Sequence, residues 1–146
     1  MHDDKNGKRA LIILGHGSRA AGAADDMEKV AERLKERLDY EIVETCQMSG
    51  KGFLFPEVFD RCMAQGGAFV LVLPYFLHRG IHILQDVPRM MQEKAAEYPG
   101  VRVVLGSNLG FDEALVDIMM KRVRESEHLR DIREMAVPDM EEHDRS

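Results

Sequence analysis

The sequence predicts a single α/β domain in which a four-stranded, mostly parallel sheet is flanked by helices, with the strand order 2-1-3-4 of flavodoxin-like folds. Two observations predict this fold class. Short apolar runs alternate four times with segments that carry apolar residues at helical spacing. The chain has 146 residues, which fit one domain and leave little room for a second. Strand and helix in alternation are typical of right-handed βαβ units, and these build parallel sheets.

The four expected strands share a high content of apolar residues. They cover residues 9–14, 40–46, 68–74 and 101–106. The run 68–74, AFVLVLP, is almost continuously apolar, which is typical of a strand that is covered on both faces.

The expected helices lie between and after these strands. The first covers residues 23–38, where Met27, Val30, Ala31, Leu34 and Leu38 recur at helical spacing. Pro56 suits the first turn of the second helix, which ends before Gly66. Asp86 and Pro88 are expected to open the third, with Asp86 as its N-cap, and residues 111–123 form the fourth.

The domain is expected to cover residues 1–125, followed by a charged tail over 126–146 that is partly helical or disordered. The start of the chain, MHDDKNGKR, is polar and lacks the apolar stretch of a signal peptide. No apolar run approaches the roughly 20 residues of a membrane helix. Cys46 and Cys62 are the two cysteines and form no CxxC pair, which favours a reducing compartment. We therefore expect a cytoplasmic protein that does not interact with membranes.

The net charge is −6, from 26 acidic and 20 basic residues. Nonspecific nucleic-acid binding requires a basic face, so this balance argues against a nucleic-acid partner. The same balance is compatible with the attraction of metal cations.

Histidines follow two of the expected strands. His16 stands directly after the first strand in GHGSR, and His78 and His82 stand in PYFLHRGIH after the third. In the order 2-1-3-4 these two strands are neighbours, and ligands of open α/β sheets bind at the carboxyl ends of such strands. We therefore expect histidines more than sixty residues apart in sequence to share one crevice.

The segment GHGSR by itself permits several interpretations. His16 could be a ligand or base on a turn where glycines let a substrate approach closely. The segment could instead cradle a phosphate with backbone N–H groups, or form a plain turn with a satisfied histidine. A nucleotide site is disfavoured because the chain has neither G-x-G-x-x-G nor a Walker lysine.

Imidazole is a suitable ligand for Fe²⁺, Co²⁺, Ni²⁺ and Zn²⁺. A structural metal normally has four protein ligands, so two histidines fit an ion that is bound in passing and keeps open positions. One imidazole could also accept protons near neutral pH.

Two motifs at this separation resemble the small sirohydrochlorin chelatases, also described as anaerobic-type cobalt chelatases. They are LIILGHGSR and VLVLPYFLHRGIHILQDVP, in which Phe76, Gly80, His82 and Asp86 fall on the family pattern P-x-F-L-x-x-G-x-H-x-x-x-D-[IV]-P. The segment YPGVRVVLGSNLGFDEAL is similar to the family's last strand and helix start. The resemblance covers about residues 8–125.

The resemblance implies insertion of Co²⁺, Ni²⁺ or Fe²⁺ into sirohydrochlorin without ATP, with Co²⁺ as the first choice, by a homodimer. It implies that His16 and His82 bind the metal and that His16 is also the catalytic proton acceptor. The substrate-binding residues that we expect around the tetrapyrrole are Arg19, Ser49, Leu77, His78, Arg79, Gly80 and Ile81. Gly80 is expected to turn the loop inward, which favours His82 over His78 as the ligand.

The chain departs from the family after the second strand. The family places a substrate-contacting glutamate there, and alignment puts Ser49 at the glutamate and Phe53 at a following proline. Glu44 and Glu57 are candidates to replace it. The departure supports an alternative function, a non-catalytic carrier of a tetrapyrrole or metal with the same fold.

Overall fold

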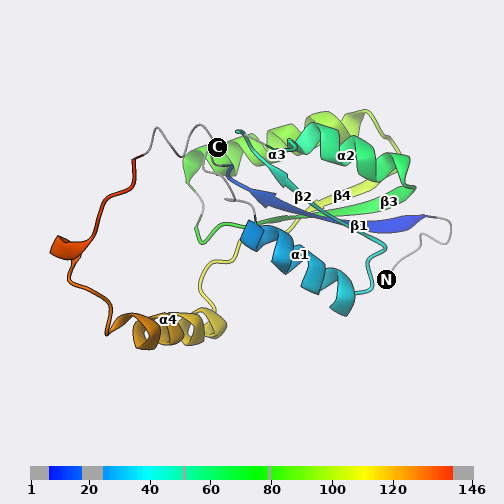
Figure 1. Ribbon diagram of the computed structural model, residues 1–146. Coiled ribbons are helices and arrows are strands. Elements are labelled where there is room, and N and C mark those ends of the chain that lie inside the picture. The colour runs from blue at the N-terminus through cyan, green and yellow to red at the C-terminus, as the bar shows by residue number, and fades with distance from the viewer. Residues whose placement is uncertain (1–6, 18–24, 51, 79, 140–146) are drawn as a thin grey trace.

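The computed structural model describes residues 7–17, 25–50, 52–78 and 80–139. Strands and helices alternate along the chain (Figure 1). The elements are β1 (Lys8–Gly15), α1 (Asp25–Arg37), β2 (Ile42–Gln47), α2 (Phe55–Ala64), β3 (Gly67–Pro74), α3 (Ile81–Ala96), β4 (Arg102–Leu105), α4 (Glu113–Ser126) and the 3-10 helix η1 (Ile132–Glu134).

The four strands form one parallel sheet in the order β2-β1-β3-β4, which confirms the predicted fold class. Leu14 near the end of β1 lies opposite Cys46 of β2 and Pro74 of β3. The carboxyl ends of these three strands therefore meet at one edge of the sheet, and GHG leaves β1 at that edge.

The helices cover the two faces of the sheet unequally. α1 lies on one face, and α2 and α3 lie on the other (Figure 1). Right-handed crossovers require this arrangement. The connection from β1 to β2 moves across the sheet in one direction, whereas the connections from β2 to β3 and from β3 to β4 move in the opposite direction, so their helices lie on the opposite face. Alternate residues of β1 accordingly enter two cores, with Ile12 facing α2 and α3, and Ile13 facing α1.

The third helix begins earlier than the sequence predicted. α3 starts at Ile81 with Gly80 at its N-cap position, and the Leu84 N–H donates to the Gly80 carbonyl at 3.1 Å. Asp86 is therefore not an N-cap, and Pro88 lies inside the helix. The prediction was wrong because Asp-x-Pro is a common helix-start signal, whereas this helix begins without a side-chain cap.

The fourth predicted helix is present, and the Asp112 side chain caps it by accepting from the Ala114 N–H at 2.9 Å. α4 projects away from the sheet in Figure 1 and has no buried residue. In the tail, η1 is the one regular element of residues 127–139, a further turn follows the end of α4, and all of these residues are exposed.

Within the described segments, no helix combines the length and the apolar character that a bilayer span requires.

Candidate functional site

The glycine after His16 is required by the close approach of the segment that follows β2. A Cβ on Gly15 would meet only the ends of flexible side chains, with the Gln47 Oε1 at 2.9 Å, so a small side-chain shift relieves that contact. Gly17 has a φ of +100°, and a Cβ there would lie 1.9 Å from the Ser49 carbonyl oxygen. The Met48 N–H donates to the Gly15 carbonyl at 2.9 Å and fixes the same approach. The turn at His16 is therefore held against the end of β2.

The His16 ring stacks on Phe76, which follows β3. The ring centroids are 3.9 Å apart with an interplanar angle of 39°. Phe76 is only 3% exposed, whereas His16 is exposed. The Tyr75 N–H donates to the Leu14 carbonyl at 2.7 Å, so the chain after β3 stays beside β1. The segments after β1 and β3 thus meet as the strand order predicts, with an imidazole on a buried phenyl ring.

Hydrogen bonds from the segment after β4 brace the segment after β3. The Leu77 carbonyl accepts from the Gly110 N–H at 2.9 Å and from the Asn108 Nδ2 at 3.0 Å. The Phe76 carbonyl accepts from the Leu109 N–H at 2.9 Å. Sequence reasoning did not identify Asn108 as part of the site. The available signal was an asparagine in a glycine-flanked segment directly after the last strand.

The two other candidate histidines differ in what the structure describes. His78 is exposed in the segment between β3 and α3. The backbone of His82 lies in the first turn of α3 rather than in a loop, and its side chain lies outside the described part. Gly80 has a φ of −87° and a ψ of 172°, and a Cβ there meets no atom within 4 Å. The expectation that a glycine at this position selects His82 was therefore wrong, because any residue can adopt this backbone.

The remaining predicted contacts surround the same edge. Leu77 and Ile81 are exposed by 57% and 72% and offer apolar surface beside His78. Ser49 is exposed and touches Gly17 through its backbone. Arg19 and Arg79 lie outside the described residues.

The two candidate replacements for the family glutamate lie in different places. Glu44 accepts from the Arg61 Nη2 at 2.8 Å, so its carboxylate pairs with α2 from the middle of β2. Glu57 is exposed in the first turn of α2, which begins at the carboxyl edge. Of the two, Glu57 lies on the side of the sheet where His16 lies, and among the described residues its carboxylate has no hydrogen-bond or ion-pair partner.

The structure also argues against a metal site with cysteine ligands and against a phosphate site at the start of α1. Burial raises the pKa of the Cys46 and Cys62 thiols to about 12, so both stay protonated near neutral pH, whereas a thiolate is the form that binds metal. α1 begins with Asp25, Asp26 and Glu28, which oppose a phosphate at that helix start.

Among the described residues, no three histidine, cysteine or carboxylate side chains gather as a metal cage. An exposed imidazole packed on a buried phenyl ring, at an edge of the sheet that also carries the exposed apolar side chains Leu77 and Ile81, suits a flat ligand and an ion that is held briefly. The fold and this site together define a small α/β domain of the chelatase type.

The comparisons agree with that class. The family model described as CbiX matches residues 10–126, and the chain belongs to this family. It is 32% identical over 117 residues to a sirohydrochlorin ferrochelatase of Priestia megaterium, covering 80% of this chain and 44% of the relative. It is 28% identical over 139 residues to a sirohydrochlorin cobaltochelatase of Methanococcus aeolicus, covering 79% of this chain and 97% of the relative.

Solved structures show the same fold. The sirohydrochlorin chelatase SirB from Bacillus subtilis subspecies spizizenii, solved in complex with cobalt, superposes with a TM-score of 0.76 at 26% identity, over 82% of this chain and 51% of that one. A CbiX protein from Marinobacter aquaeolei gives a TM-score of 0.68 at 30% identity, over 80% of this chain and 95% of that one. The chain thus spans about half the length of some relatives and nearly all of others.

Proposed function

We propose that this protein inserts a divalent metal ion into sirohydrochlorin without ATP, with Co²⁺ as the first candidate and Ni²⁺ or Fe²⁺ as alternatives. The observation that carries the proposal is the stack of His16 on Phe76, because it joins the segments after β1 and β3 at the carboxyl edge. The relatives support the substrate class, since they are named as cobaltochelatases and ferrochelatases of sirohydrochlorin.

The proposed chemistry needs a base and a loosely held ion. As the metal enters the macrocycle, two pyrrole N–H protons must leave and the ion must lose bound water. His16 is proposed to bind the incoming ion and, once the ion has passed to the macrocycle, to accept one of the two protons and release it to solvent, while the other proton leaves to water. His82 is proposed as the second ligand, and the position of its backbone in the first turn of α3, directly after the segment that follows β3, supports this assignment.

The tetrapyrrole is proposed to lie over the segment between β3 and α3. The exposed apolar side chains Leu77 and Ile81 support this position, because a flat macrocycle has two apolar faces to cover. The other proposed contacts of the substrate are Arg19, Ser49, His78, Arg79 and Gly80. Arginines there would pair with the carboxylates of the macrocycle.

The test is anaerobic incubation of the protein with Co²⁺ and sirohydrochlorin, followed by absorption spectroscopy. We expect metallation to be faster than in a protein-free control, and His16→Ala to remove at least about 90% of the acceleration. His128→Ala is the matched control, because His128 is an exposed histidine beyond α4. Equal rates for His16→Ala and the parent would contradict the proposed role.

A carrier is the second candidate, and Ser49 at the position of the family glutamate is the observation that favours it. A carrier would shift the spectrum of sirohydrochlorin on binding and leave the metallation rate at that of the control. The same experiment therefore separates the two functions.

We further propose that the protein acts in the cytoplasm as a homodimer. The free and buried thiols of Cys46 and Cys62 are consistent with a reducing compartment. Light scattering of the purified chain measures the oligomeric state directly.

A further inference from the structure

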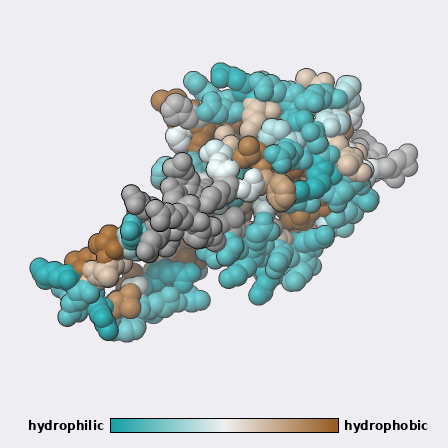
Figure 2. Space-filling view, turned by 45° about the horizontal axis from the view of Figure 1, so that its top comes forward, coloured by the Kyte–Doolittle hydropathy of each residue, from teal (hydrophilic) through white to brown (hydrophobic). Residues whose placement is uncertain are grey.

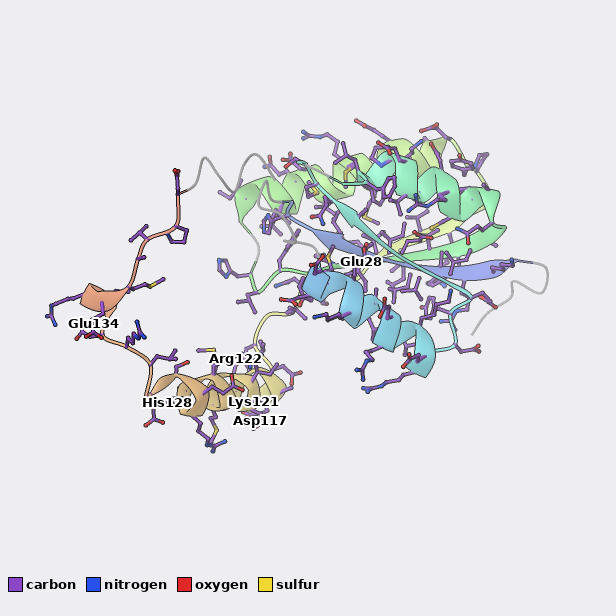
Figure 3. All side chains as sticks on the ribbon, viewed as in Figure 1. Glu28, Asp117, Lys121, Arg122, His128 and Glu134 are labelled. Atoms are coloured by element: carbon purple, nitrogen blue, oxygen red, sulfur yellow. The ribbon has the colours of Figure 1, made fainter. Side chains whose placement is uncertain are left out.

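α4 carries a broad apolar face that the described part of the chain leaves uncovered. Apolar side chains on this helix are exposed by 39% to 63%: Val116, Ile118, Met119, Met120 and Val123. Figure 3 shows α4, with Asp117, Lys121 and Arg122 labelled, standing apart from the sheet, and Figure 2 shows apolar surface on this projecting part. An amphipathic helix is normally stabilised by burial of such a face.

The sheet has a matching face over which the described part of the chain places no second helix beside α1 (Figure 1). α1 packs against β1 and β2. On the same face, Leu71 and Leu73 of β3 and Val104 of β4 are only half-buried. Val104 belongs to this face because the side chain of Val103 packs into the opposite core. We call Leu71, Leu73 and Val104 the open half-face.

The connection between β4 and α4 favours a second copy over closure within one chain. Gly106, Leu109 and Gly110 donate backbone hydrogen bonds to Val72, Phe76 and Leu77 and hold the connection against β3 and the segment after it. Only Phe111 and Asp112 separate Gly110 from the helix, and Asp112 is already committed as the cap. A short hinge of this kind favours the exchange of an element between copies.

The charges beside the two faces are complementary. A hollow of about 360 Å³ runs along α1 on its exposed side, lined by Lys29, Val30, Arg33, Leu34 and Arg37. On α4, Glu113 precedes Val116 by three residues, and Asp117 precedes Met120 by three. Each carboxylate therefore lies beside an apolar side chain on the helix surface. In the described part of the chain no ion pair is found for these acidic residues or for the basic residues of the hollow. A helix laid beside α1 would bring acidic side chains to a basic row.

We propose that α4 of each chain packs on the open half-face of a second copy, beside that copy's α1, and that the exchange is reciprocal about a two-fold axis. The inference rests on the proposed homodimer and is independent of the proposed chemistry. It assigns the interface to α4 and the open half-face.

Crosslinking of two distinguishable chains tests the exchange. Val104→Cys is placed in one chain and Met119→Cys in a second chain that carries a size tag, and the two are co-expressed and treated with a short bismaleimide. The native thiols of Cys46 and Cys62 are buried and stay protonated, so we expect the bismaleimide to react only with the introduced cysteines. We expect a product of the summed size. Lys121→Cys in place of Met119→Cys is the control on the polar face, and we expect little product from it.

The oligomeric state gives an independent measurement. We expect the parent to be a dimer by light scattering, with Met119→Asp raising the dimer dissociation constant at least about 100-fold and Lys121→Asp changing it less than about threefold. A dimer that survives Met119→Asp, or a double variant Val104→Cys/Met119→Cys that crosslinks within one chain, would overturn the exchange and leave the homodimer standing. A monomeric parent would overturn both. The metallation assay compares the parent protein with a protein-free control whatever its oligomeric state, so failure of the proposed function is recognised separately.

Discussion

Replacement of Gly17 by alanine tests the arrangement that places His16. Gly17 has a φ of +100°, and a Cβ added to it would lie 1.9 Å from the carbonyl oxygen of Ser49 and 2.8 Å from its carbonyl carbon. Both atoms belong to the backbone, so the overlap cannot be relieved by rotation of a side chain. The variant must open the contact between the GHG turn and the segment after β2.

Two other glycines serve as controls that separate backbone strain from steric overlap in the loss of stability expected for Gly17→Ala. Gly52 has a φ of +103°, and a Cβ there meets only the Gln47 Cγ at 3.9 Å, so Gly52→Ala introduces backbone strain without overlap. We expect it to lower the free energy of unfolding by about 1–2 kcal/mol. Gly17→Ala adds an overlap that costs roughly 1–3 kcal/mol more. Gly80→Ala has neither penalty, and we expect a change within about 1 kcal/mol.

Thermal unfolding followed by circular dichroism is the assay. For a domain of this size each kcal/mol shifts Tm by about 4 °C, so Gly52→Ala should lower Tm by roughly 4–8 °C and Gly17→Ala by roughly 8–20 °C. Gly17→Ala should also slow metallation more than Gly52→Ala, because the displaced turn carries His16. Equal Tm values for Gly17→Ala and Gly52→Ala would refute the close approach of Ser49.

Three further predictions concern the site and the acid stability of the fold. His82→Ala should abolish Co²⁺ binding while the circular dichroism spectrum is retained, and His78→Ala should keep the affinity within a few-fold by calorimetric titration; the reverse result would assign the ligand to His78. Phe76→Leu should lower kcat about tenfold with a smaller change in KM, because the imidazole loses its stacking partner. Phe59→Leu is the control: Phe59 is a buried residue of α2, and its replacement should lower the free energy of unfolding by about 1–2 kcal/mol and leave kcat unchanged. A hydrogen bond from a lysine ammonium of α3 holds the pKa of Asp60 below its usual range, so the stability it contributes is present above about pH 4 and is lost as the pH falls further. Asp60→Asn should therefore lower the urea midpoint slightly at pH 7 and leave it unchanged at pH 2.

The strands and their order were predictable because they depend on local composition and on a general rule of handedness. Apolar runs such as ALIIL in β1 cannot be exposed, and right-handed crossovers then leave few ways to connect them. The start of α3 was not predictable from local signals. Asp86 and Pro88 have the spacing of a helix start, yet the chain enters the helix five residues earlier at Ile81, where no side-chain cap marks it.

The candidate site shows the same division between local and distant causes. The sequence predicted that His16 would meet the segment after β3, because neighbouring strands end at one edge. It did not predict Phe76 as the stacking partner or the hydrogen bond from Asn108 to Leu77, since both depend on contacts between segments far apart in the chain. Gly17 and Gly80 illustrate the limit most directly. Both are glycines beside candidate ligands, and only Gly17 needs to be one.

The brace on Leu77 links the site to the proposed interface. The same short connection that donates to the Phe76 and Leu77 carbonyls leads through Gly110 into α4. A change in the direction of α4 must therefore be absorbed at Phe111 and Asp112 or passed to the hydrogen bonds on Leu77. Because Asp112 is held by its cap bond to Ala114, little freedom remains at the hinge. The position of α4 on a second copy would thus help to fix the segment that carries Leu77 and His78, and a dimer held through α4 would present two such segments in a defined conformation.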